Sequence, residues 1–191
     1  ERRRLAGRPG EETGFDPDAF VMTEVAPIDE FASAIAGSVR THIEPLAPGA
    51  AVYLEPGRFI AAHSTTILLT VTAVKPDCVI VDGGINMLGD SGPAEYAFAP
   101  IVNLSRPGDG LSRRTVCGPL CDPADLWGRI VYGGEPLAGD LLAVLHQGAY
   151  TFSTAWRFIK PIPRYVACSG GRLALARETE RFDDRYAGCR F

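Results

Sequence analysis

Seven short apolar or β-branched stretches follow one another in the last two thirds of the chain. Turn-forming residues (Gly, Pro, Asp and Asn) separate them. Many short strands with turns between them are typical of a β-sandwich or β-barrel. We therefore predict strands at residues 59–74, 78–81, 96–104, 114–116, 129–132, 140–145 and 165–167, with short helical turns at 84–88 and 123–126.

The first part of the chain has a different pattern. Residues 1–26 are polar and have no hydrophobic period, whereas apolar residues recur at helical spacing over residues 27–44. Pro45 and Pro48 end this predicted helix, and the apolar stretch 51–54 is of strand type. A helix, a short loop and a strand make one unit of a (β/α) barrel, and one such unit cannot close a barrel.

Composition and charge exclude several classes of function. The chain has 191 residues, of which 46% are apolar and 22% charged, so it is globular. A net charge of −4 gives no electrostatic reason to expect nucleic acid or an anionic membrane as a partner. No apolar run has membrane-spanning length. The five cysteines form no Cys-x-x-Cys pair and the three histidines have no metal-ligand spacing, so we expect free thiols, no metal and a cytoplasmic protein.

The segment between the first part and the strand-rich part is Leu54-Glu55-Pro56-Gly57-Arg58. Pro56 fixes its own φ angle, and Gly57 allows a turn that a Cβ atom would obstruct. Such a turn would present Glu55 and Arg58 together at the carboxyl end of a strand, where barrel enzymes place their active sites. The alternative is an ordinary surface turn with two solvated charges.

Three further stretches contain residues that can carry chemistry. Residues 117–125 form a Gly- and Pro-constrained loop with two thiols and two carboxylates. Residues 140–150 are an apolar strand that ends in Gly-Ala-Tyr, and residues 82–96 begin with Asp-Gly-Gly and end at Tyr96. Taken singly, each has a structural explanation, because cysteine is usually a small buried residue and Asp-Gly-Gly is usually a turn.

Taken in order, these four motifs resemble the pyridoxal-phosphate decarboxylases of the alanine-racemase-like fold. That family includes ornithine, diaminopimelate, arginine and carboxynorspermidine decarboxylases, and the resemblance runs from about residue 28 to about residue 177. It implies the last part of a (β/α)₈ barrel followed by a C-terminal β domain of sandwich or Greek-key barrel type. Residues 1–58 would then be the end of the cofactor-binding barrel, incomplete in this chain, and residues 59–191 the β domain.

The resemblance also implies roles for residues near the cofactor. Glu55 corresponds to the acid that hydrogen-bonds the pyridine nitrogen of pyridoxal 5'-phosphate, where a carboxylate favours the protonated, electron-withdrawing ring. Gly57 and Arg58 belong to the same motif. Arg58 corresponds to the arginine that contacts the phosphate or the substrate carboxylate. Tyr150 corresponds to the tyrosine beside the cofactor.

Other implied roles involve the substrate and a second subunit. Cys121 corresponds to the catalytic cysteine that one subunit of a homodimer inserts into the neighbouring site, where it protonates the product. Asp122 would hold a distal ammonium group of an amino-acid substrate, and Tyr96 would also contact the substrate. Asp122 and Gly92 occupy places where diaminopimelate decarboxylases have Glu and Arg, which argues against a substrate with a second carboxylate.

The chain differs from the family pattern most clearly in its lysines. Family members bind the cofactor aldehyde through a lysine early in the barrel. Lys75 and Lys160, the only lysines here, both lie in stretches that match the β domain. We therefore expect a partner segment, the N-terminal barrel with the Schiff-base lysine, and we expect this chain alone not to decarboxylate anything.

Two functions from different classes follow. One is decarboxylation of an amino acid or an amino-acid-derived intermediate, with this chain as the C-terminal portion of the enzyme. The alternative is an inactive homologue that regulates a partner by occupying its dimer interface. A racemase of related fold is weaker, because the sequence lacks a recognisable two-base arrangement. The substrate is not identified by the sequence.

Overall fold

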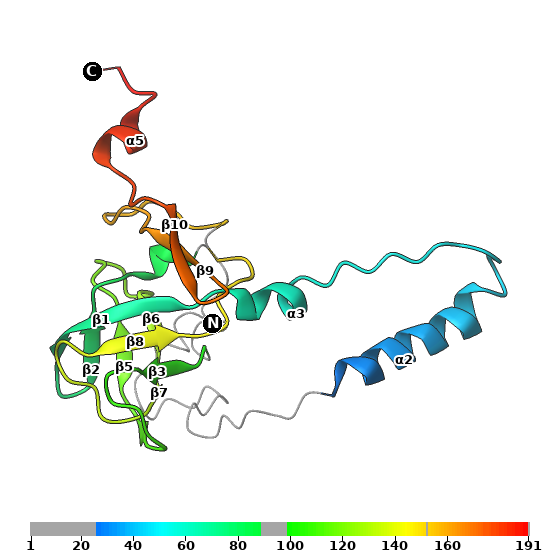
Figure 1. The fold of residues 1–191 in the computed structure, drawn as a ribbon, viewed down its shortest axis with the longest axis horizontal. Coiled ribbons are helices and arrows are strands. Elements are labelled where there is room, and N and C mark those ends of the chain that lie inside the picture. Colours follow the sequence, from blue (N-terminus) through cyan, green and yellow to red (C-terminus); the bar gives the residue numbers. More distant parts are fainter. Residues whose placement is uncertain (1–25, 89–98, 152, 191) are drawn as a thin grey trace. The chain divides into compact units, whose positions relative to one another are not determined.

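The computed structural model describes residues 26–88, 99–151 and 153–190. The chain divides into two compact units, with residues 12–56 in one and residues from Gly57 onward in the other (Figure 1). Each is described by itself.

A helix forms most of the described part of the first unit. Helix α2 covers Ile28–Ser38 and continues as one π-helical segment, η1, over Val39–Ile43, which confirms the predicted helix. The negative charges of Asp29 and Glu30 in its first turn interact favourably with the positive N-terminal end of the helix dipole. Its apolar face, formed by Ile28, Phe31 and Ile35, is 40–52% exposed.

The predicted strand at residues 51–54 is wrong. These residues have an irregular, exposed backbone in the described part of this unit. A strand needs a hydrogen-bonded neighbour, and neither sheet of the described residues includes residues 51–54.

The strand predicted from residue 59 begins later than expected. Residues Arg58–Ala61 form helix α3 and Ala62–Ser64 a 3₁₀ turn, η2, before strand β1 runs over Ile67–Val74. The Gly57 carbonyl accepts hydrogen bonds from the amides of Ile60 and Ala61, which closes the first helical turn. At the start of this stretch the local backbone hydrogen bonds of a helical turn therefore formed, although the apolar residues predicted a strand.

The second unit is built on one mixed sheet. Within the described residues the sheet has eight strands in the order β4-β7-β3-β8-β1-β2-β5-β6. Most neighbours are antiparallel, but β2 pairs with β5 and β3 with β7 in parallel. The strands after β1 are β2 (Cys78–Val81), β3 (Ile101–Asn103), β4 (Leu111–Ser112), β5 (Thr115–Cys117), β6 (Leu126–Gly128), β7 (Val131–Tyr132) and β8 (Leu141–Val144).

One hydrophobic cluster contains side chains from strands at or next to the two ends of this strand order. Trp127 on β6 and Val131 on β7 are both fully buried in it, together with Leu69 and Val71 of β1. The Trp127 indole donates a hydrogen bond to the Gly83 carbonyl, so its polar group is also satisfied. The sheet thus encloses a single core, as expected for the predicted β domain.

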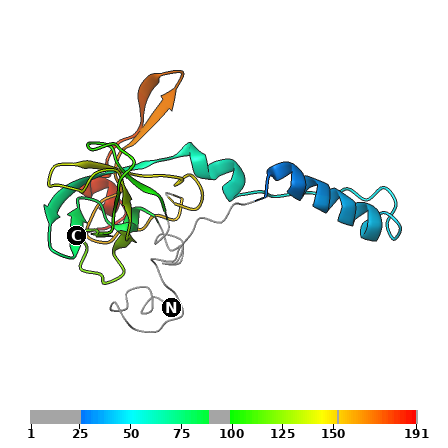
Figure 2. The ribbon, with the colours of Figure 1, turned by 90° about the horizontal axis from the view of Figure 1, so that it is seen from below.

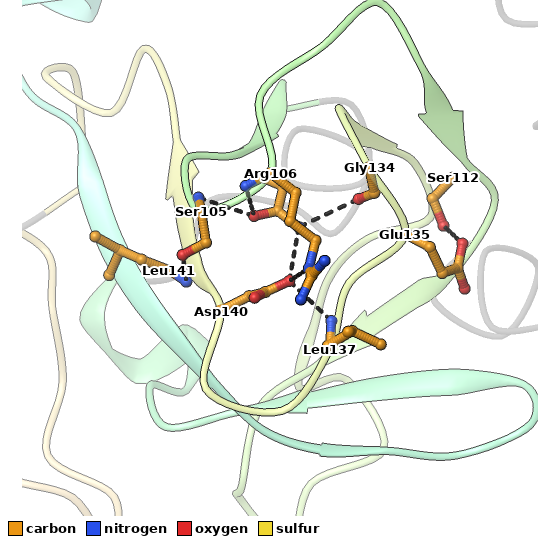
Figure 3. A network of polar contacts seen from close by, with 9 residues as sticks. Ser105, Arg106, Ser112, Gly134, Glu135, Leu137, Asp140 and Leu141 are labelled. Atoms are coloured by element: carbon orange, nitrogen blue, oxygen red, sulfur yellow. Dashed lines mark hydrogen bonds and ion pairs between the residues drawn. The ribbon is translucent and has the colours of Figure 1, made fainter.

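A buried carboxylate joins the ends of strands in this sheet (Figure 3). One oxygen of Asp140, just before β8, accepts hydrogen bonds from Asn103 Nδ2, Arg106 Nε and the Leu137 amide at 2.9–3.0 Å. These bonds, that from Asn103 first, hold the Asp140 pKa below its ordinary value. The network thus ties the end of β3 and the turn before β8 together.

A separate hairpin follows the sheet. Strands β9 (Tyr165–Ser169) and β10 (Arg172–Arg177) pair antiparallel, and Figure 2 shows this hairpin extending from the rest of the unit. Helix α5 (Phe182–Tyr186) comes after it.

Several predicted elements are confirmed and others are wrong. Strands β1, β2, β3, β5, β7, β8 and β9 fall within or overlap predicted stretches, and the turn predicted at 84–88 is the 3₁₀ segment η3 (Ile85–Met87). Part of the stretch 96–104 lies outside the described residues. Residues 123–126 form a turn that enters β6 instead of a helix, because Asp122 and Asp125 close it by hydrogen bonds. Strands β4, β6 and β10 and helix α5 were not predicted.

Candidate functional site

Gly57, Arg58 and Tyr150 come together in the second unit. The Arg58 guanidinium carbon lies 5.5 Å from the centre of the Tyr150 ring, in cation–π geometry. The Tyr150 hydroxyl lies so close to the Gly57 Cα that a Cβ atom at position 57 would overlap it. Both Arg58 and Tyr150 are exposed. The structure thus places a cation and an aromatic ring side by side on an accessible surface.

The loop that carries Tyr150 is fixed against the start of the second unit. The amides of Gln147 and Gly148 donate to the carbonyls of Thr65 and Ala62. A Cβ atom at Gly148 would overlap the Ala61 carbonyl, so only glycine allows this approach. Tyr150 itself has a φ angle of 63°, an uncommon left-handed conformation for a residue with a bulky side chain. Helix α3 and this loop therefore form one local structure.

The Cys121 loop joins β5 to β6. Cys121 is an exposed, free thiol at this connection. The carboxylate of Asp122 accepts a hydrogen bond from the Ala124 amide at 2.8 Å, which closes an Asx turn. The Cys121 side chain is therefore accessible on a loop of constrained backbone.

Asp125 is a residue of this loop to which sequence reasoning assigned no role. It is 5% exposed, and its two carboxylate oxygens accept hydrogen bonds from the amides of Ile85 and Leu120. Burial, the largest cause, raises the pKa of Asp125 above its ordinary value. The sequence feature that could have indicated this residue is a second acidic residue, three positions after Asp122, in a loop that also contains Gly118.

Two histidines were also missed. The rings of His63, on η2, and His146, before Gly148, are 4.3 Å apart at their centres and nearly perpendicular. Burial, and secondly the neighbouring His63, lower the pKa of His146. The two histidines are 83 positions apart in the sequence, so no local pattern links them. They come together because His63 lies before β1, His146 lies after β8, and these two strands pair antiparallel.

Three residues named from the sequence, Glu55, Tyr96 and Gly92, are not placed relative to this arrangement by the structure. Glu55 is exposed and belongs to the first unit, so its relation to Arg58 stays a prediction. Tyr96 and Gly92 lie outside the described residues. The roles of all the named residues stay predictions as well.

The two lysines lie in the second unit. Lys75 directly follows β1, and its backbone amide donates a hydrogen bond to the Cys78 carbonyl. Lys160 lies between Tyr150 and strand β9. Residues 26–88, 99–151 and 153–190 contain no group of three His, Cys, Asp or Glu side chains that could hold a metal ion. Among the helices of this described part, none is long and apolar enough to cross a membrane.

Comparisons with known proteins agree on one family. The family model described as "Pyridoxal-dependent decarboxylase, C-terminal sheet domain" matches residues 20–148. Diaminopimelate decarboxylase of Methanothermobacter thermautotrophicus is 34% identical over 168 residues, which cover 84% of this chain and 39% of that protein. L-glutamyl-(BtrI acyl-carrier protein) decarboxylase of Niallia circulans is 27% identical over 185 residues, or 90% of this chain and 43% of that protein.

Solved structures give the same result. A crystal structure of diaminopimelate decarboxylase from M. jannaschii in complex with L-lysine matches with a TM-score of 0.75 and 26% identity, over 88% of this chain and 39% of that one. Lysine/ornithine decarboxylase from Vibrio vulnificus, in complex with cadaverine, matches with a TM-score of 0.54 and 28% identity, over 73% and 38%. The chain thus spans about two fifths of the length of the relatives it matches first.

Proposed function

The chain belongs to the pyridoxal-dependent decarboxylase family, as its C-terminal sheet domain, and from this premise we propose that it is the C-terminal portion of an enzyme that decarboxylates an amino acid or an amino-acid-derived intermediate. The observation that carries the proposal is the convergence of Gly57, Arg58 and Tyr150 in one place. A domain that only occupies a partner's interface has no need of an exposed cation held against an aromatic ring.

The residues present fit pyridoxal 5'-phosphate in two respects. Arg58 offers a guanidinium fork to a phosphate or carboxylate, and Tyr150 offers a ring face and a hydroxyl. Gly57 leaves the space that the Tyr150 hydroxyl occupies. When bound, the cofactor supplies the electron sink that makes loss of carbon dioxide possible. In this proposal Glu55 keeps the pyridine nitrogen protonated, and the N-terminal barrel segment supplies the lysine.

The Cys121 loop would act at the carbon that has lost its carboxylate. In a dimer with shared sites, the Cys121 thiol of one subunit donates a proton to that carbon in the neighbouring site. Asp122 is half-buried, and one of its oxygens is engaged by the Ala124 amide, which fixes the carboxylate for contact with a substrate ammonium group. We assign Tyr96 a contact with the substrate as well.

The substrate we propose is an α-amino acid with a distal ammonium group, or a derivative of one. Asp122 supports this assignment, and Gly92 in place of Arg disfavours a second carboxylate at that end. Relatives named for diaminopimelate and for a carrier-bound glutamyl group both match, so free and carrier-bound substrates should be compared.

The test uses the protein with its barrel segment. Pyridoxal phosphate is titrated by its absorbance change, and carbon dioxide release is measured with lysine, ornithine and diaminopimelate. Arg58→Gln should weaken cofactor or substrate binding by about tenfold or more, because a charge-assisted hydrogen bond is lost. Arg172→Gln, at an exposed arginine of β10, is the matched control and should change neither. Absence of both a cofactor signal and carbon dioxide release would favour the regulatory alternative.

A further inference from the structure

Leu120, the residue just before Cys121, is held from two sides. The Leu120 amide donates to Asp125 Oδ2 at 2.7 Å, and the Leu120 side chain is buried against Gly84. A Cβ atom at Gly84 would come within 2.5 Å of the Leu120 side chain. The next residue, Cys121, is exposed. One residue is thus anchored in the domain and its neighbour projects from it.

The same carboxylate ties this anchor to a second segment. Asp125 Oδ1 accepts a hydrogen bond from the Ile85 amide at 2.9 Å, at the start of η3. The ends of the loop are closed by the Gly118 amide, which donates to the Asp125 carbonyl at 3.1 Å. The Asp125 carboxylate therefore bridges Leu120 of the Cys121 loop and the first residue of η3.

Space for this carboxylate depends on a glycine. A Cβ atom at Gly118 would overlap both oxygens of Asp125. The two amides go to different oxygens, so only a carboxylate can accept both. An asparagine at position 125 would place its NH₂ group against one of the two N–H donors.

We propose that Asp125 is a positioning residue for Cys121, acting through the Leu120 peptide, so that the thiol reaches its protonation geometry. The proposal rests on the proposed function for its catalytic consequence, but the geometry of the loop is independent of it. Burial of the ionised carboxylate is unfavourable by itself, as its raised pKa indicates, so its two amide bonds are what retain it.

The test compares three single variants and one double variant of the protein with its barrel segment, in a background where the exposed Cys168 and Cys189 are serine. Asp125→Asn and Gly118→Ala should each lower kcat by about tenfold or more while KM and cofactor affinity change little, because misplacement affects only proton delivery. In Cys121→Ala, adding Asp125→Asn should cost almost nothing more, since the two residues act as one unit. The proposal would be overturned if Asp125→Asn lowered kcat by the same factor in the Cys121→Ala background as in the protein that keeps Cys121.

A second readout does not need activity. The rate of iodoacetamide alkylation of Cys121, measured by peptide mass, should change by more than about threefold in Asp125→Asn and in Gly118→Ala, because loop closure is a local equilibrium. Asp140→Asn is the matched control, because Asp140 is also a buried carboxylate that accepts a backbone amide, but at the ends of other strands. If both loop variants alkylate at the control rate, the positioning role is refuted. If no substrate is turned over but alkylation changes, only the proposed function fails.

Discussion

At the scale of the residue, three non-glycine residues in the described part of the chain have a positive φ angle, which is the left-handed conformation: His146, Tyr150 and Ile159. Two of them flank Gly148 in the loop against helix α3, so strain is concentrated beside the candidate site. His146 adds a titratable group whose pKa is lowered by burial and by His63.

His146→Asn should make the protein less sensitive to acid. Since the folded-state pKa of His146 lies below its ordinary value of about 6.5, protonation favours the unfolded state, and stability present above that value is lost as pH falls through the folded pKa. Asparagine cannot be protonated and tolerates a left-handed backbone. Thermal midpoints at about pH 7.5 and about pH 5.5 should differ less than in the wild type. His42→Asn is the control, and an equal pH response in the wild type and His146→Asn would contradict this expectation.

At the scale of the element, the short turn η3 links two loops of the candidate site. Its first amide is held by Asp125 of the Cys121 loop. Its second residue, Asn86, exchanges hydrogen bonds with Trp156, since the Trp156 amide donates to the Asn86 carbonyl and Asn86 Nδ2 donates to the Trp156 carbonyl. The Thr154 hydroxyl also lies near the carbonyls of Leu88 and Tyr150. This turn, whose middle residue Asn86 is fully buried, therefore connects the Cys121 loop with residues 154–156.

Asn86→Ala should loosen the segment after Tyr150. Removing Nδ2 leaves the Trp156 carbonyl without this donor, which should destabilise the domain by about 1–3 kcal/mol. Urea unfolding measures the loss, and hydrogen exchange of residues 154–160 should become faster. Asn103→Ala, at the other fully buried asparagine, should also destabilise the domain but leave exchange in this segment slow. Similar exchange in the two variants would disprove the link.

At the scale of the whole molecule, the chain carries residues proposed for two different active sites. Arg58 and Tyr150 would serve the site of their own subunit, whereas the exposed Cys121 would serve the neighbouring one. A homodimer with two-fold symmetry then contains two sites, each assembled from both subunits.

Mixing two inactive variants should restore activity if sites are shared. When Arg58→Ala and Cys121→Ala subunits are mixed equally and exchange freely, half of the dimers contain both, and each of these has one intact site. Carbon dioxide release should return to about a quarter of the wild-type value. Arg58→Ala mixed with the double variant Arg58→Ala/Cys121→Ala is the control and should stay inactive. No recovery in the first mixture, with exchange of subunits verified, would exclude shared sites.

Much of the fold was predictable because its signals are local. The apolar spacing from Ile28 to Ile43 predicts the helix, and alternating strand and turn residues predict most of the sheet. Strands β4 and β6 are only two and three residues long, too short to give a pattern. The strand predicted at 51–54 failed because a strand depends on a partner that its own residues cannot specify.

The order of motifs along the sequence determined the family, which the comparisons show, and it named Gly57, Arg58, Cys121, Asp122 and Tyr150 as candidates. Only the tertiary structure decided that Tyr150 lies against Gly57 and Arg58, that Asp125 anchors the Cys121 loop, and that η3 connects both. The physical reason is that these contacts join residues up to 93 positions apart, as between Gly57 and Tyr150. Such contacts arise from strand pairing around a common core, which no local pattern encodes.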